Sequence, residues 1–377
     1  MKYLLDLKKL EPADIVLESG NTKLVSDLIK KVTKSHYSHA MLYIDHSINH
    51  ATSDGGVYSK NPQRILVDDP TDLKVLRLRD RIPLMAKQQI CKESSYLIGS
   101  LYGKREAALA IKNTNKPAKS RKQFCSRMVA QCYAKYGINI VNNPDYCTPE
   151  DINSSNILVE VEDCIREANE HDLIIFGRRD PNIELQEETY KWLDKSRVVF
   201  KKIGIEIQTI NDITAHLAND RKYDNKIVKL INETKYCDLY NVDREINTMR
   251  YSTEEMHLFL TNSDNINEKI NSEIALNDRE ITRHTENLKL SRVNYKNARL
   301  KFSKLHVTLY ENILNETLTR LKVLKDAISL LGNNPDSLQI KIDSLETLLA
   351  ERLYRSSYHL TPASNRCLVY ATLVRTS

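Results

Sequence analysis

The sequence has 377 residues, of which 41% are hydrophobic and 28% are charged, and its formal net charge is +6. This length and composition are typical of a globular protein of two or three domains, and they exclude a disordered or membrane-embedded chain. The positive charge is spread along the whole chain, so we expect no specific binding to nucleic acid.

The seven cysteines are odd in number and no two have the CxxC spacing. This pattern argues against a disulfide framework or a zinc site, and it favours a reducing compartment. The N-terminal residues contain no long apolar segment of the kind found in signal peptides, and no apolar run approaches 18 residues. We therefore expect no transmembrane segment, and either a cytoplasmic location or export by a specialised route that needs no signal peptide.

The first 52 residues predict three strands and one helix. Residues 14–18, 35–45 and 48–52 are the three predicted strands, and residues 22–32 have apolar residues at helical spacing, which predicts the helix. If residues 44–47 form a hairpin loop, Tyr43 lies opposite Ile48. Side chains alternate along a strand, so His39 and His50 then share a face and lie within reach of each other. The alternative is that both are ordinary half-buried strand residues.

Residues 73–79 predict another strand and Pro83 opens a helix that runs to about Tyr102. Residues 103–122 contain seven basic residues and little hydrophobic periodicity, so we expect a loop. One interpretation of this loop is a solvated connection. The other is a basic flap that receives an acidic substrate or a lipid headgroup.

The segment after this loop predicts a helix with Cys125 in its first turn. Met128, Val129, Cys132 and Tyr133 follow at helical spacing and give the helix one apolar face. A thiol at a helix N-terminus feels the positive end of the helix dipole, which favours the nucleophilic thiolate. The alternative is a small buried structural cysteine.

Two further elements complete the first 180 residues. Thr148 is a predicted N-cap with Pro149 at the first helical position, and residues 173–176 predict a late strand before Gly177.

The composition changes after Pro181, where glycine nearly disappears and helical patterns dominate. Residues 265–331 contain neither proline nor glycine, and apolar residues recur there at steps of three, four and seven. This pattern predicts a long amphipathic or coiled-coil helix of roughly 100 Å if it is unbroken, with a break favoured between Leu290 and Lys301 where the apolar stripe thins. Residues 332–335 are a stop signal, and a second helix follows from about Asp336 to Leu353.

The two long helical segments are expected to pair as a hairpin. They either pack only on each other and on the first domain, or use their apolar stripe at residues 261–354 for a protein partner or for self-association. A membrane-surface role is disfavoured because the stripe lacks aromatic residues and its charges are mixed.

Six short motifs occur in an order that resembles a known group: Asp14-Ile15-Val16-Leu17, Tyr37-Ser38-His39-Ala40-Met41, Ile48-Asn49-His50-Ala51, Leu101-Tyr102-Gly103, Phe124-Cys125-Ser126 and Thr148-Pro149-Glu150-Asp151-Ile152. Over about residues 10–178 the sequence resembles the circularly permuted branch of the NlpC-type papain-like cysteine hydrolases. That branch includes the YiiX-like amidases and the lecithin-retinol acyltransferase group. In the permuted order, the histidine strand precedes the cysteine helix, as it does here.

The resemblance implies that Cys125 is the nucleophile and His39 the base. It places His50 at the position of the third, orienting residue, and Tyr102 where a tyrosine assists the oxyanion site. Arg127 stands where the family commonly has an acidic residue after Cys-Ser. Cys125, His39 and His50 could also bind a metal as a Cys-His site, but the resemblance explains these residues without one, and we expect no metal and no cofactor.

Two functional interpretations remain open. In the first, the protein is a thiol hydrolase with a Cys-His-His constellation that cleaves a peptide or isopeptide amide, or a lipid acyl ester, through an acyl-enzyme. In the second, the papain-like module is non-catalytic or an acyltransferase within an interaction protein that binds its partner through the C-terminal helices. A secreted bacterial effector is one form of either interpretation, suggested by the composition rich in Lys, Asn and Ile.

The predicted fold class is therefore α+β, with an antiparallel papain-like sheet and a nucleophile helix followed by an all-α region. The predicted domains are a hydrolase domain at residues 1–180, a helical connecting region at 181–260, and a long helical hairpin, coiled-coil-like, at 261–377.

Overall fold

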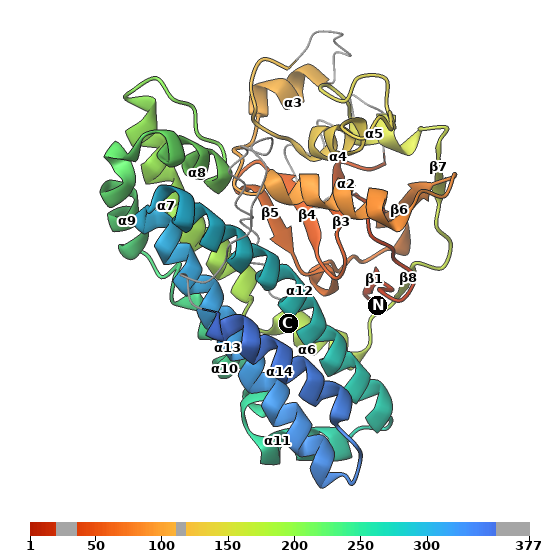
Figure 1. Ribbon diagram of the computed structural model, residues 1–377. Helices are drawn as coiled ribbons and strands as arrows, with labels where there is room; N and C mark the ends of the chain where they lie inside the picture. The colour runs from red at the N-terminus through yellow and green to blue at the C-terminus, as the bar shows by residue number, and fades with distance from the viewer. Residues whose placement is uncertain (20–35, 111–117, 352–377) are drawn as a thin grey trace. The chain divides into compact units, whose positions relative to one another are not determined.

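The computed structural model describes residues 1–19, 36–110 and 118–351 (Figure 1). Its internal contacts divide the described chain into two compact units. The first unit contains residues 1–186 and 204–209, and the second contains residues 187–203 and 210–351. None of the helices in the described ranges is long and apolar enough to cross a membrane.

The first unit is built on an antiparallel sheet of six strands in the order β5-β4-β3-β2-β6-β7. A separate pair, β1 (Tyr3–Leu5) and β8 (Ile165–Glu167), joins the N-terminus to a much later segment. The strands of the main sheet are β2 (Ile15–Glu18), β3 (His39–Tyr43), β4 (Ile48–Thr52), β5 (Gly56–Lys60), β6 (Leu73–Leu78) and β7 (Leu158–Glu160).

Alternation along these strands separates two apolar cores. Leu17 and Leu42 belong to the core that includes the helix α4 (Cys125–Ala134), whereas Val16 and Met41 belong to a second core. The predicted apolar face of the cysteine helix is confirmed, since Met128, Val129, Cys132 and Tyr133 are all buried in the structure. The antiparallel sheet and its helices confirm the α+β fold class.

Four other helices lie in the described part of the first unit: α2 (Leu84–Tyr96), α3 (Lys104–Ala110), α5 (Pro149–Asn153) and α6 (Glu170–Gly177). Two of them correct the sequence predictions. Residues 173–176 lie in α6 and not in a strand, because Asn169 and Asp172 form a reciprocal capping box that starts a helix just before the apolar run. Residues 104–110 form α3 within the stretch that was expected to be a loop, while the helix predicted at residues 22–32 lies outside the described residues.

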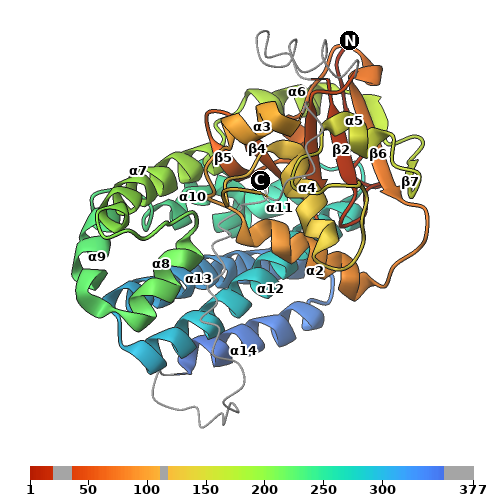
Figure 2. The ribbon, with the colours of Figure 1, turned by 90° about the horizontal axis from the view of Figure 1, so that it is seen from above.

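The described part of the second unit is helical. It contains α7 (Pro181–Lys201, which begins in the first unit), α8 (Ile210–Asn219), α9 (Asp224–Asn232), α10 (Asp243–Ile246), α11 (Thr253–Thr261), α12 (Ile266–Ala298), α13 (Lys301–Leu330) and α14 (Asp336–Ala350). Helix α13 packs against both α12 and α14, and Figures 1 and 2 show these three helices side by side. The pairing of α13 with α14 was expected from the stop signal at residues 332–335.

The long helix expected over residues 265–331 is broken into α12 and α13, at the place where the thinning stripe favoured a break. Arg299 has a left-handed backbone with φ 51°, which ends α12. The carboxylate of Asp224 then accepts hydrogen bonds from the backbone N–H groups of Lys301 (2.7 Å) and Phe302 (2.9 Å) and so caps α13. The break named in the sequence analysis is therefore present, and a cap from another helix supplies the stop signal that the local sequence lacks.

The buried face of α12 is largely polar, which also differs from the expected apolar stripe. Ile274 and Ile281 of that stripe are only half-buried. Seven polar residues instead recur at alternating steps of four and three and are buried: Glu273, Asn277, Glu280, His284, Asn287, Ser291 and Asn294. This polar seam has the spacing that an apolar seam would have, and it is buried together with the apolar residues Ile270, Leu276 and Leu288 of the same helix.

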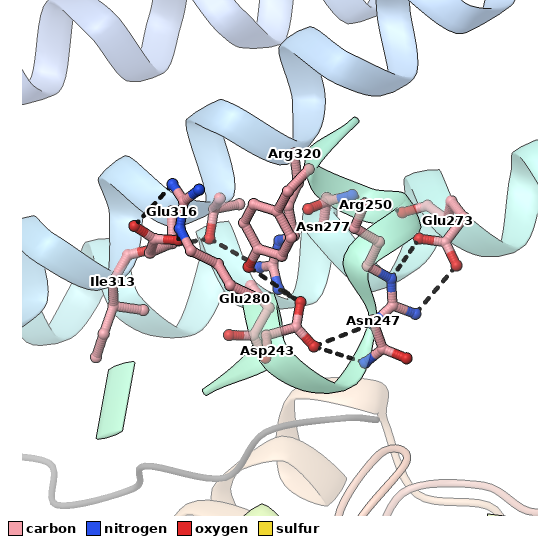
Figure 3. A network of polar contacts seen from close by, with 12 residues as sticks. Asp243, Asn247, Arg250, Glu273, Asn277, Glu280, Ile313, Glu316 and Arg320 are labelled. Atoms are coloured by element: carbon pink, nitrogen blue, oxygen red, sulfur yellow. Dashed lines mark hydrogen bonds and ion pairs between the residues drawn. The ribbon is translucent and has the colours of Figure 1, made fainter. Parts of the chain in front are cut away.

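Figure 3 shows the ion-pair network at the N-terminal end of this seam. The Arg250 guanidinium donates to both carboxylate oxygens of Glu273, at 2.9 and 3.0 Å. Asp243 receives contacts from Arg250 at 3.3 Å and from Arg320 at 3.1 Å. Because these four side chains are nearly fully buried, each charge depends on its partners and the network fixes the register of α12 against its neighbours.

Candidate active site

Cys125 is the first residue of helix α4, as the sequence predicted. Phe124 precedes it with an extended backbone (φ −135°, ψ 165°), so the helix begins at the cysteine. Burial on its own would raise the pKa of the Cys125 thiol. A hydrogen bond with His39, the charge of that imidazole, and backbone hydrogen bonds at Ala40 and Ser126 outweigh burial and hold the pKa below its ordinary value of 9.0.

The hairpin that carries the two histidines has the predicted register. Tyr43 pairs with Ile48, and the N–H of Ile44 donates to the carbonyl of Ser47 at 2.8 Å. The two residues between them, Asp45 and His46, both have positive φ (65° and 62°), which is the turn geometry that suits a tight hairpin. The loop length that was needed to bring His39 and His50 together is therefore confirmed.

His39 and His50 are in direct contact. Nε2 of His39 lies 3.0 Å from Nδ1 of His50, and the ring centroids are 5.3 Å apart. His39 thus hydrogen-bonds to His50 and also lowers the pKa of the Cys125 thiol. The structure brings these three predicted residues into one chain of contacts.

His50 is held as a neutral imidazole. Burial, followed by the charges of His39 and Lys60, places the pKa of His50 well below its ordinary value of 6.5. The Tyr58 ring packs edge-on against it, with centroids 4.3 Å apart. Nε2 of His50 has no hydrogen-bond partner among the described residues. A neutral imidazole with its proton on Nε2 leaves Nδ1 free to accept a hydrogen bond from Nε2–H of His39.

Tyr102 lies beside the start of the cysteine helix. Tyr102 forms an isolated parallel β-bridge with Gln123, and the N–H of Gly103 donates to the Gln123 carbonyl at 2.8 Å. Burial, together with the negative charge of Cys125, raises the pKa of the Tyr102 phenol, so the hydroxyl stays protonated and can donate a hydrogen bond. This places the predicted oxyanion residue within electrostatic reach of the thiol.

Arg127 is a residue whose position the sequence reasoning did not anticipate. The side chain is fully buried, with its guanidinium packed against the rings of Phe124 (4.6 Å) and Tyr146 (5.0 Å). It donates to the carbonyls of Lys122 (2.9 Å) and Asp145 (2.7 Å). Arg127 therefore ties the segments on both sides of the site to the helix that carries Cys125.

Further contacts stabilise the same region. Ser126 donates its hydroxyl to the Cys147 carbonyl at 2.6 Å, next to Thr148, which forms the predicted N-cap of α5 with a reciprocal bond to Asp151. Asp14 of the first motif is buried and accepts two hydrogen bonds from Arg77, both at 2.7 Å. These motif residues have structural roles that hold the helix and the sheet in place.

Residues 9–154 match the family model described as permuted papain-like amidase enzyme, YaeF/YiiX, C92 family. Over this range the chain is similar to the permuted papain-like amidases. The resemblance drawn from the six motifs is confirmed on its YiiX-like side, and the matched residues include Cys125, His39, His50 and Tyr102.

In a search of solved structures, the chain is also similar to a protein titled metalloprotein yiiX from Escherichia coli O157:H7. The two share 15% sequence identity with a TM-score of 0.32, and the match covers 41% of this chain and 97% of the other. A comparison with curated proteins gave no match. Within residues 1–19, 36–110 and 118–351, no group of three or more His, Cys, Asp or Glu side chains has a geometry that could hold a metal ion.

Proposed function

We propose that the amidase domain hydrolyses an amide bond of a peptide-type substrate, with Cys125 as nucleophile, His39 as general base and acid, and His50 as the residue that orients His39. The observation that carries this proposal is the position of His39, which contacts the thiol and lies 3.0 Å from a buried imidazole. The family match supports the amide as the bond that is cleaved.

In the resting enzyme, His39 takes the proton from the Cys125 thiol. Nε2 of His39 faces His50, so Nδ1 is the nitrogen left for the sulfur. The imidazolium then donates from Nδ1 to the thiolate and from Nε2 to the neutral His50. His50 fixes the ring orientation and stabilises the positive charge, which is the role of the third residue in a catalytic triad.

The thiolate attacks the carbonyl carbon of the substrate and forms a tetrahedral oxyanion. The backbone N–H of Cys125, at the start of α4, and the protonated Tyr102 hydroxyl are the donors proposed to stabilise that charge. His39 gives its proton to the leaving amine as the C–N bond breaks, which yields a thioester. His39 next removes a proton from water, the water attacks the thioester, and the acid product and the free thiol are released.

The finer identity of the substrate belongs to the same proposal. A peptide bond and an isopeptide bond present the same carbonyl and the same leaving amine, so the mechanism serves both. A lipid acyl ester, or an acyl acceptor other than water, would use the same thioester with a different second step.

The test is cleavage of a defined peptide library, prepared by digesting a proteome with a specific protease, by the purified full-length protein. Mass spectrometry identifies new termini made by the wild type and by Cys125→Ala, and H₂¹⁸O shows whether water resolves the acyl-enzyme. We expect new carboxyl termini that carry one ¹⁸O and disappear in the variant. Equal cleavage by both proteins, or none by the wild type, would contradict a peptide amidase.

A further inference from the structure

The basic stretch before the cysteine helix has a structural relation to the nucleophile. Residues 103–122 contain seven basic residues and one acidic residue, Glu106. The structure describes both ends of this stretch, helix α3 and residues 118–122. Four exposed cations on these ends are defined here as the cationic rim: Lys104, Arg105, Lys119 and Arg121.

Both ends of the stretch are fixed next to Cys125. The N–H of Gln123 donates to the Leu101 carbonyl at 2.9 Å, and the N–H of Gly103 donates to the Gln123 carbonyl at 2.8 Å. Lys104 is two residues after Tyr102, and Arg121 is four residues before Cys125. Since an extended chain advances at most about 3.6 Å per residue, their Cα atoms lie within about 7 Å of Tyr102 and about 14 Å of Cys125 respectively.

The one carboxylate of the stretch does not neutralise the rim. Glu106 accepts a short hydrogen bond from the Ser120 hydroxyl. Although burial raises the pKa of Glu106, that hydrogen bond and the charges of Arg127 and Lys122 lower it on balance. The carboxylate is therefore engaged with the half-buried side of the stretch.

Three of the four rim cations lack a carboxylate partner in the described part of the chain. Lys104, Arg105 and Lys119 form no ion pair with a carboxylate among the described residues. Other cations of the same unit do have a carboxylate partner, for example in Lys74–Glu160 at 3.1 Å and Lys2–Asp68 at 2.7 Å. Unpaired like charges gathered at one place repel one another, and an anion that binds there relieves the repulsion.

We infer that the substrate is an acidic peptide, and that the cationic rim binds carboxylate side chains on the residues flanking the scissile amide. This inference rests on the proposed function, because the family match supplies the peptide-type amide and the rim supplies the preference for negative charge. Arg127 holds the backbone of Lys122 to the nucleophile helix, so the rim has a fixed position relative to Cys125. Lys104, Arg105 and Lys119 are then specificity residues, separate from the groups that carry out the chemistry.

The first experiment uses two alkylating reagents that differ in charge. The rate constants for Cys125 with anionic iodoacetate and neutral iodoacetamide are measured by mass spectrometry on the full chain at about 10 mM ionic strength. Their ratio is divided by the same ratio for free N-acetylcysteine. At this ionic strength, one positive charge about 10 Å from the thiol raises the rate constant of an anionic reagent roughly 1.6-fold. The triple variant Lys104→Gln/Arg105→Gln/Lys119→Gln removes three such charges, so it is expected to lower the iodoacetate-to-iodoacetamide ratio about fourfold.

A matched control removes three cations at the other end of the strands. Lys8, Lys9 and Arg81 are exposed and lie near the Ile15 end of β2 and the Leu78 end of β6, whereas His39 pairs with Glu18 at the opposite end. The variant Lys8→Gln/Lys9→Gln/Arg81→Gln should leave the ratio within about 1.5-fold of wild type. An equal fall in both variants, or no fall in the rim variant, would overturn the local role of the rim.

The peptide library then tests the substrate itself. We expect Asp and Glu to be enriched within a few residues of the wild-type cleavage sites, and this enrichment to be lost in the rim variant but kept in the control. Cleavage sites without acidic enrichment would overturn the inference while leaving the amidase intact. A protein with neither cleavage nor rapid iodoacetamide labelling of Cys125 would instead show that the proposed function has failed.

Discussion

Replacing His50 by leucine tests the arrangement of Cys125, His39 and His50 at the most deeply buried of the three residues. The change removes the acceptor 3.0 Å from Nε2 of His39 but keeps a buried side chain of similar size. A hydrogen bond to a charged group contributes about 1.5–3 kcal/mol, and each 1.36 kcal/mol corresponds to a factor of ten. The thiolate–imidazolium pair should therefore be less populated, and the rate of Cys125 alkylation by iodoacetamide at pH 7 should fall by about 10- to 160-fold.

Two controls separate this effect from a loss of structure. His50→Gln places an amide oxygen near the same position and should recover most of the rate, while His36→Gln changes an exposed histidine and should have no effect. Because Nε2 of His50 has no partner among the described residues, leucine should not lower the melting temperature by more than a few degrees. A folded His50→Leu protein whose Cys125 reacts at the wild-type rate would refute the orienting role.

Three further predictions concern the oxyanion donor and the helical unit. Tyr102→Phe should reduce kcat on a cleaved peptide by about 10²–10³ if the hydroxyl is an oxyanion donor. The rate of Cys125 alkylation should stay unchanged, because alkylation forms no oxyanion. Equal effects on kcat and on the alkylation rate would point to a structural role of Tyr102. Glu273→Gln leaves the buried Arg250 and Arg320 to share the single carboxylate of Asp243 and should cost about 3–5 kcal/mol in urea unfolding. The exposed Glu233→Gln should cost less than about 1 kcal/mol, and equal costs would contradict the network. Burial lowers the pKa of His306 from 6.5 to about 4, so on acidification the imidazole is protonated in the unfolded chain before it is protonated in the folded protein. The free energy of unfolding should therefore fall by about 3 kcal/mol between pH 6.5 and pH 4. His306→Gln should remove this contribution to the pH dependence of stability.

The site could be predicted because its geometry depends on local rules. Strand alternation and a four-residue connection were sufficient to place His39 near His50, and the structure adds only the positive φ values of Asp45 and His46. The first-turn position of Cys125 followed from the apolar spacing of its helix. The burial of Arg127 did not follow, since it depends on Tyr146 and on carbonyls that come from separate segments. An arginine two residues after the nucleophile, within an otherwise apolar helix face, was the available signal.

The helical region shows where periodicity misleads. An apolar run at residues 173–176 suggested a buried strand, but the capping box at Asn169 and Asp172 was the stronger local signal. In α12 the buried positions carry polar residues at the spacing that apolar residues usually have. The two glutamates of this seam have partners that come from other elements: Arg250 donates to Glu273, and the charge of Arg320 acts on Glu280. No inspection of α12 alone could identify those partners.

The most direct test of the central claim is brief labelling with iodoacetamide near pH 7, followed by mass spectrometry of all seven cysteines in the wild type and in His39→Ala. Cys91 and Cys237 are more exposed than Cys125, but burial raises the pKa of each thiol to about 12, whereas His39 lowers the pKa of the Cys125 thiol.

We predict that Cys125 reacts fastest in the wild type although it is only 5% exposed, and that it loses this advantage when His39 is replaced. Slow labelling of every cysteine, or rapid labelling of Cys125 that persists without His39, would contradict an activated Cys125–His39 pair.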